Sequence, residues 1–134
     1  MKKKSVAVGL SGGVDSAVTA AFLVECGFDV KGITMSTWDH AMNVEETGKK
    51  GCYGSNKEKD IHDARKVAKL LGIPFKVIDL KNEFRREIIS YFKHEYLNGK
   101  TPNPCVICNR QLKFGLLVQK AAQKFDFDFF ATGH

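Results

Sequence analysis

The chain has 134 residues, of which 43% are hydrophobic and 27% are charged, and its formal net charge at pH 7 is +6. This length suits one domain with a single core, and the composition is ordinary for a soluble globular protein. No apolar run approaches the ~20 residues that span a bilayer, and a polar, glycine-rich turn after the basic N-terminus argues against a signal peptide. We therefore expect a cytoplasmic protein with no membrane partner, and the positive charge suits a polyanionic partner.

The N-terminal part of the chain predicts a strand, a turn of small residues and a helix in direct succession. Residues 6–8 favour a buried parallel strand, and residues 17–24 have the composition of a packed helix. Such a turn gathers free backbone N–H groups and the positive end of the helix dipole at one place, which suits phosphate. The residues expected to bind a nucleotide there are Gly9, Leu10, Ser11, Gly12, Gly13, Val14, Asp15 and Ser16.

Asp15 occupies the position at which a Walker A loop carries lysine. A loop that holds the β- and γ-phosphates for hydrolysis needs that cation, whereas a carboxylate suits a bound Mg²⁺ or a backbone donor. Gly12 and Gly13 lack Cβ atoms and would let a phosphate approach closely. Ser11 and Ser16 can add hydroxyl donors, and Asp15 or Ser16 can cap the helix. The alternative is a strand–helix turn with a polar cap and no ligand.

The rest of the chain alternates strands with helices, which predicts an α/β domain: a Rossmann-like parallel sheet with helices on both faces. In such sheets ligands bind beyond the carboxyl ends of the strands. The turn from Thr101 to Pro104 is expected to be rigid and non-helical, and the long polar loop at residues 36–57 to be functional. Further strands are expected at residues 29–34, 75–80 and 127–131. Further helices are expected at residues 60–71 and from near Cys108 or Asn109 to about Phe125. Between them, a helix capped by Asn82 is expected to run to about Tyr96 and to bury Phe84, Ile88, Ile89 and Phe92.

Cys105 and Cys108 form a CxxC pair at the expected start of the last helix. A thiol becomes more reactive beside a helix N-terminus and cations, which Arg110 and Lys113 would supply here. Cys108, and with it Cys105, is therefore a candidate nucleophile or sulfur carrier. The alternatives are ligands of zinc or of an iron–sulfur cluster, with Cys52 as a further thiol, a redox pair, or inert packing at a helix start.

Six motifs resemble, in order, the N-terminal domain of the tRNA-specific 2-thiouridylases (the MnmA family), which are PP-loop ATP pyrophosphatases of the adenine nucleotide alpha hydrolase-like fold. The resemblance covers essentially the whole chain. The first motif is shared with many adenylating enzymes, and the motif with proline, cysteine and asparagine is more specific. The motifs are residues 9–16, 32–38, 63–65, 101–109, 113–114 and 131–134.

This resemblance implies thiolation of the wobble uridine in the tRNAs for lysine, glutamate and glutamine. ATP, with Mg²⁺, would activate the C2 oxygen as an adenylate and release pyrophosphate, and a persulfide fed by a sulfur-donor protein would then supply sulfur. The residues that match the family's nucleotide site are the ATP loop Gly9–Ser16, Met35, which contacts the adenosine, and Gly133, which closes the nucleotide pocket. The catalytic residues that match are Asp15 and the nucleophile Cys108. The residues that match those at the target base are Asn103, Pro104 and Cys105.

Two departures from the family matter. Many members carry Asp where this chain has Cys105, which favours a variant that depends on a [4Fe–4S] cluster. Members are also much longer, so residues 1–134 are expected to be the PP-loop domain alone, without the second catalytic cysteine and the central and C-terminal domains. Such a fragment should bind nucleotide without completing thiolation. We expect tRNA contact from Lys100, Arg110 and Lys113.

Two other functions stay open. Another PP-loop ligase or synthetase could amidate a small substrate, and it would not need Cys108. A truncated module could bind a nucleotide or an iron–sulfur cluster without catalysis and act with a partner.

Overall fold

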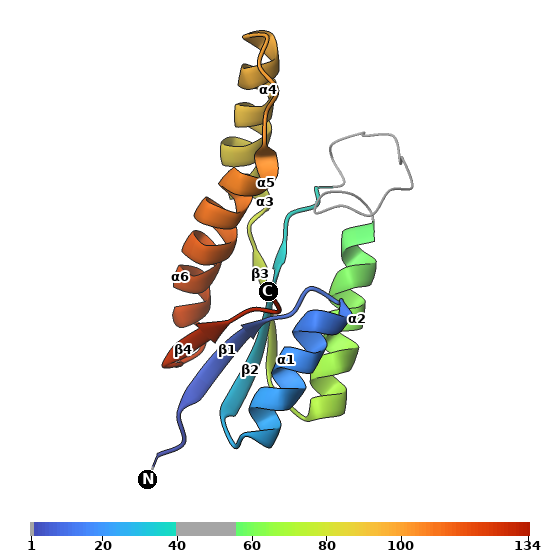
Figure 1. The fold of residues 1–134 in the computed structure, drawn as a ribbon, viewed down its shortest axis with the longest axis vertical. Coiled ribbons are helices and arrows are strands. Elements are labelled where there is room, and N and C mark those ends of the chain that lie inside the picture. Colours follow the sequence, from blue (N-terminus) through green and yellow to red (C-terminus); the bar gives the residue numbers. More distant parts are fainter. Residues whose placement is uncertain (1, 40–55) are drawn as a thin grey trace.

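The computed structural model describes residues 2–39 and 56–134, and it confirms the α/β class and the alternation of strands with helices (Figure 1). The strands are β1 (Ser5–Gly9), β2 (Asp29–Ser36), β3 (Phe75–Asp79) and β4 (Phe129–Ala131). The helices are α1 (Val14–Glu25), α2 (Asn56–Leu71), α3 (Lys81–Phe84), α4 (Ser90–Leu97), α5 (Pro104–Ile107) and α6 (Leu117–Ala122), and the segments η1 (Arg85–Ile89) and η2 (Cys108–Leu116) are π-helical. Within the described ranges, no helix is long and apolar enough to cross a bilayer.

The described strands form one parallel sheet in the order β3-β2-β1-β4. Strand β1 is central, since Val6 pairs with Val30 on one side and with Phe129 on the other. The chain steps outward from β1 to β3 and then returns to the far side of β1 to add β4. The carboxyl ends of β1 and β4 therefore flank the topological switch point, where a ligand is expected in this class of sheet.

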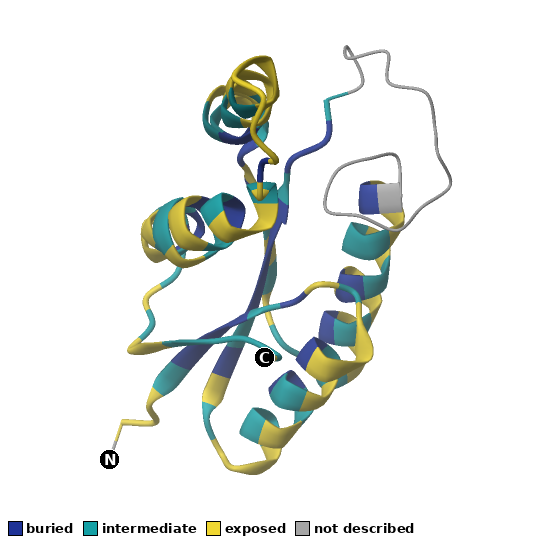
Figure 2. Ribbon diagram, turned by 45° about the horizontal axis from the view of Figure 1, so that its top comes forward, coloured by how far each residue is buried: buried dark blue, intermediate teal, exposed yellow. Residues whose placement is uncertain are grey.

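Helices cover both faces of the sheet (Figure 1). Because alternate strand residues point to opposite faces, Val6 and Val8 pack with Ala20 of α1 and Ala64 of α2. Figure 2 shows the resulting buried layer along the strands, with exposed residues concentrated on the outer sides of the helices. The core of the opposite face includes Ala7, Ile33, Ile78, Ile88, Cys108, Leu112 and Leu117.

Two π-helical segments, η1 and η2, interrupt the helical runs on this second face. A π-turn closes over five residues instead of four, so it rotates the residues that follow. In η2 and the start of α6, the buried residues Leu112 and Leu117 are separated by five positions. This five-residue spacing is that of a π-turn, and both residues belong to the same core cluster.

The expected start of the last helical run was wrong. The run begins at Pro104, not near Cys108, and so the segment from Thr101 to Pro104 is not wholly non-helical. Asn103 is the N-cap, since its side-chain oxygen accepts a hydrogen bond from the Val106 N–H at 3.4 Å. Proline fits the first helical position because its missing N–H has no acceptor there in any helix.

Replacing this cap should destabilise the start of α5. We expect Asn103→Ala to lower the free energy of unfolding by about 0.5–2 kcal/mol, whereas Asn103→Asp should retain most of the stability because aspartate also caps well. Urea denaturation of the two variants beside the unmodified chain measures the difference. Equal losses for Ala and Asp would show that the cap does not stabilise this helix.

The helical run after β3 also differs from the prediction at its ends. Asn82 does not cap it, because the run begins at Lys81, whose N–H donates to the carboxylate of Asp79 at 3.0 Å. Phe84 and Ile88 are buried as expected, but Phe92 is 39% exposed. The reason is that α4 projects beyond the end of the sheet, so its side chains have no strand to cover (Figure 1).

An ion pair between Glu83 of α3 and Lys120 of α6 joins these two helical runs, and Lys120 also donates to the Asp79 carbonyl at 3.4 Å. The hydrogen bond from Lys120 lowers the pKa of Glu83. A carboxylate with a lowered pKa stabilises the fold above its ordinary titration range and loses that contribution as the pH falls through the lowered pKa.

We therefore expect Glu83→Gln to cost less than about 1 kcal/mol of unfolding free energy at neutral pH, since the pair is partly exposed. The cost should decrease as the pH falls through the lowered pKa of Glu83, because the native carboxyl then becomes neutral. Urea denaturation across this range tests the expectation. A cost that stays constant with pH would assign the effect to packing rather than to charge.

Candidate functional site

The loop after β1 is built around the hydroxyl of Ser16, which is 4% exposed. Ser16 Oγ accepts a hydrogen bond from the Ser11 N–H at 3.1 Å and donates to the Gly13 carbonyl at 3.2 Å. The Ser11 hydroxyl lies 3.1 Å from Ser16 Oγ and accepts from the Gly13 N–H at 3.3 Å. The two serines therefore hold the shape of the loop, a role that the sequence did not predict.

Helix α1 begins at Val14, and Gly13 stands at its N-cap position without a side-chain cap. The expectation that Asp15 or Ser16 caps this helix is wrong, because both residues lie inside its first turn. The N–H groups of Val14, Asp15 and Ser16 have no acceptor within the helix, since the acceptors would precede its start. These donors and the positive end of the dipole of a 12-residue helix meet at the carboxyl end of β1.

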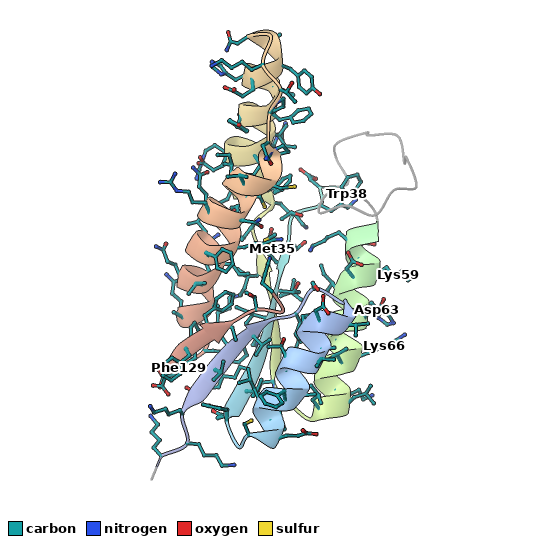
Figure 3. The ribbon with its side chains drawn as sticks, viewed as in Figure 1. Met35, Trp38, Lys59, Asp63, Lys66 and Phe129 are labelled. Atoms are coloured by element: carbon teal, nitrogen blue, oxygen red, sulfur yellow. The ribbon has the colours of Figure 1, made fainter. Side chains whose placement is uncertain are left out.

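A cavity of ≈ 690 Å³ lies at this end of the sheet. Its volume is in the range of small-molecule sites. One part of the wall is apolar and comes from Ile33 and Met35 of β2, Leu117 of α6 and Phe130 of β4. Figure 3 shows Met35 at the upper end of the sheet, between the two helical layers. The polar part of the wall includes Ser11, Asp15, Ser16, Lys57, Asp60 and Lys113.

The cavity brings together most of the predicted nucleotide residues. Gly9, Leu10 and Gly133 line it with Ser11, Asp15, Ser16 and Met35. Gly12, Gly13 and Val14 belong to the same loop but not to the cavity wall. Gly12 has φ +82°, and a Cβ there would lie 2.6 Å from the Asp60 carbonyl oxygen. Its missing side chain therefore makes room for α2, where the sequence suggested room for a phosphate.

Gly133 packs directly on the first turn of α1. A Cβ at this position would lie 2.6 Å from the Ser16 backbone nitrogen and 2.8 Å from the Asp15 carbonyl carbon. The segment that follows β4 thus closes one side of the cavity against the loop, and only glycine allows this approach. Thr132 and His134 line the cavity on either side of Gly133.

The CxxC pair lies outside the cavity wall. Cys105 is exposed, whereas Cys108 is 4% exposed and packs in the core cluster with Leu112. Because the helix begins at Pro104, Cys105 lies in its first turn and Cys108 lies beyond it. The influence of the helix terminus falls off within one turn, so it acts on Cys105 and hardly on Cys108, contrary to the expectation from the sequence.

The donor set of the cavity fits a magnesium ion held with a phosphate. Mg²⁺ is usually bound by one or two carboxylates together with substrate phosphates, and Asp15 and Asp60 both line the cavity. Within the described ranges, no group of three or more acidic, histidine or cysteine side chains could hold a metal by itself. Cys52, the further thiol considered for zinc or a cluster, lies outside the described residues, so cluster ligation stays a prediction.

Sequence reasoning missed Lys57 and Asp60 as wall residues. The expected helix began at residue 60, whereas α2 begins at Asn56, and this extra turn carries Lys57 to the cavity with an exposure of 8%. A lysine in the first turn of a helix is unusual because its positive charge lies beside the positive end of the helix dipole. This was the signal in the sequence that could have pointed to Lys57.

Other predicted features have structural roles or lie on the surface. Within residues 63–65, Ala64 is fully buried, and the guanidinium of Arg65 lies 5.3 Å from the centre of the Phe75 ring. Figure 3 shows Asp63 on the side of α2 that faces away from the sheet. Asn103, Lys100 and Arg110 are exposed, while Lys113 lines the cavity.

The model of the tRNA methyl transferase HUP domain matches residues 4–134. Proteins named tRNA-specific 2-thiouridylase MnmA are similar over nearly the whole chain. The one from Carboxydothermus hydrogenoformans is 47% identical over 98% of this chain and 35% of its own length. The one from Geobacter metallireducens is 48% identical over 98% of this chain and 35% of its own length. The chain thus spans about a third of the length of the curated relatives it matches.

Two solved structures share the fold. A predicted subunit of tRNA methyltransferase from Methanocaldococcus jannaschii has a TM-score of 0.59 and 19% identity, covering 98% of this chain and 53% of that one. NMN synthetase from Francisella tularensis has a TM-score of 0.53 and 21% identity, and the match covers 95% of this chain and 44% of that one. From the family match over residues 4–134 and these identities, the chain belongs to the tRNA methyl transferase HUP domain family and is an N-terminal domain of the MnmA type.

Proposed function

We propose that this chain is the nucleotide-binding part of an enzyme that uses ATP to thiolate the wobble uridine of the tRNAs for lysine, glutamate and glutamine. The observation that carries the proposal is the cavity at the switch point of the sheet, into which the loop of residues 9–16 presents a carboxylate instead of a Walker lysine. The names of relatives that are 47–48% identical support tRNA as the substrate.

The two parts of the cavity wall suit the two ends of ATP. The adenine would lie against the apolar part formed by Ile33, Met35 and Leu117, and the phosphates would lie at the first turn of α1. There the free N–H groups and the helix dipole favour negative charge. Gly133 holds this end of the cavity closed by its contact with Ser16.

Asp15 and Asp60 would hold the magnesium ion against the phosphates. When bound, Mg²⁺ neutralises charge on the phosphate oxygens and orients the chain of phosphates. With a carboxylate in place of the cation that assists hydrolysis of the γ-phosphate, we assign cleavage between the α- and β-phosphates. The C2 oxygen of uridine would then attack the α-phosphorus, pyrophosphate would leave, and the base would carry AMP.

Sulfur transfer would complete the reaction at the CxxC segment. The target base would meet the turn formed by Asn103, Pro104 and Cys105, and Cys108 would act as the nucleophile. The terminal sulfur of a protein-bound persulfide, supplied by a donor protein, would attack C2 of the base, and AMP would leave with the activated oxygen. The Cys108 thiol would then lose its proton and attack the sulfur of the persulfide carrier, forming a disulfide with it and releasing the 2-thiouridine. Since Cys108 is buried, tRNA binding at the exposed turn must open a path to it. We place this reaction in the cytoplasm, where tRNA is found.

The proposal is tested in a bacterial strain that lacks its own 2-thiouridylase. The gene that encodes this chain, in its natural reading frame, should restore 2-thiouridine in the three tRNAs, measured by mass spectrometry of digested tRNA. Asp15→Asn should abolish the restoration, while Asp63→Asn, on the outer side of α2, should leave it intact (Figure 3). Failure of the unmodified gene, with the protein present, would contradict tRNA thiolation.

A further inference from the structure

A loop without the Walker lysine leaves the charge of the nucleotide phosphates to be balanced from elsewhere in the cavity. Two lysines line the cavity, Lys57 from α2 on one face of the sheet and Lys113 from η2 on the other. Lys57 is 8% exposed and already interacts with another group of the protein. Lys113 is half-buried and, among the described residues, has no ion-pair partner.

Lys113 lies in η2 and lines the cavity together with Leu117, four residues later. In a π-helix each turn closes between residues i and i+5, so Lys113 lies one such turn after Cys108. Cys108 is buried in the core, and Leu117, at the start of α6, lines the cavity with Lys113. Lys113 therefore belongs to the cavity wall and to the same helical segment as the buried Cys108.

The neighbouring aromatic residue fixes this wall in position. The ring of Phe114 packs edge-on against Phe130 of β4, with ring centres 6.3 Å apart, and lies 6.1 Å from the ring of His134. These contacts attach η2 to the end of β4, beside the glycine that closes the cavity. The ammonium group of Lys113 is thus carried by a segment that is packed against the cavity, not by a free loop.

We propose that Lys113 binds the phosphate chain of the nucleotide and supplies, from η2, the cation that a Walker loop carries within itself. This inference rests on the proposed binding of ATP. A half-buried ammonium that has no acidic partner among residues 2–39 and 56–134, in a cavity that also receives the N-terminus of α1, is suited to a phosphate oxygen. Hydrogen bonds between charged groups are the strong ones. Lys113 is then a nucleotide residue, whereas the sequence suggested contact with tRNA.

The test compares four ligands on the full chain by isothermal titration calorimetry with Mg²⁺: ATP, ADP, AMP and adenosine. Lys113→Ala should weaken ATP binding by about 10-fold or more, the effect of losing a charged hydrogen bond. Its affinity for adenosine should be unchanged, because adenosine has no phosphate. Lys113→Arg should recover part of the ATP affinity. Lys124→Ala removes an exposed lysine eleven positions later and is the matched control.

The outcomes separate the inference from the proposed function. If the unmodified chain binds ATP and Lys113→Ala binds it equally well, the inference is wrong and the proposed function stands. An equal loss of ATP and adenosine affinity would make Lys113 a packing residue of the wall and would also overturn the inference. If the unmodified chain binds none of the four ligands, the proposed nucleotide site fails, and the inference fails with it.

Discussion

Gly133→Ala is expected to lower the ATP affinity of the chain by at least about 10-fold and its unfolding free energy by about 1–3 kcal/mol, the usual cost of overpacking. The added methyl group would lie 2.6 Å from the Ser16 backbone nitrogen, and backbone cannot move aside as the end of a flexible side chain can. The segment after β4 must then separate from the first turn of α1, which opens the cavity at the proposed phosphate end.

Titration calorimetry with ATP and thermal denaturation measure the two effects. Gly115→Ala is the matched control, since a Cβ there would meet its nearest atom, the Arg110 carbonyl oxygen, at 3.4 Å. It should change neither quantity by much. Unchanged ATP affinity in Gly133→Ala, with a folded protein, would mean that the contact between Gly133 and Ser16 does not form part of the nucleotide site.

Cys108→Ser is expected to reduce 2-thiouridine in the complemented strain to the level of the empty strain. The proposed reaction requires a thiol nucleophile, and a hydroxyl replaces it poorly. ATP binding should be unaffected, because Cys108 does not line the cavity. This separation of ATP binding from thiolation distinguishes a sulfur-transfer enzyme from a ligase of the same loop class.

Two further variants keep this prediction clear of folding effects. A buried hydroxyl costs stability, so Cys108→Ala, which has no polar group to bury, should show the same loss of thiolation. Cys26→Ser, at an exposed position after α1, should retain full thiolation. If both Cys108 variants fold and still thiolate tRNA, the assigned nucleophile is wrong.

The strand ends of the fold could be predicted because their residues carry a strong local signal. The run from Val6 to Val8 is apolar and is followed by a loop of small residues, and this pattern placed a ligand site at the carboxyl end of β1. Met35 lies at the end of β2 and Gly133 follows β4, and the parallel arrangement brings both to the same cavity. The sequence did not predict which strand pairs with β4, and the order β3-β2-β1-β4 shows that β4 is the neighbour of β1.

The parts that escaped prediction depend on contacts between distant residues. Gly12 is required by the approach of Asp60, which lies on α2, and no local pattern shows that approach. Lys113 of η2 lines the same cavity as the loop after β1, and no local pattern places these two distant segments together. The start at Pro104 depends on capping by Asn103, a signal that was present but was read as the end of a rigid turn.

The position at which ATP is cleaved tests the central claim most directly. The protein made from the natural reading frame is incubated with Mg²⁺, unmodified tRNA, a persulfide donor and ATP labelled at the α-phosphate, and the labelled product is identified by chromatography. We predict labelled AMP, with pyrophosphate released in equal amount and only when tRNA is present. Labelled ADP would show cleavage between the β- and γ-phosphates and would contradict the adenylating role assigned to the loop around Asp15.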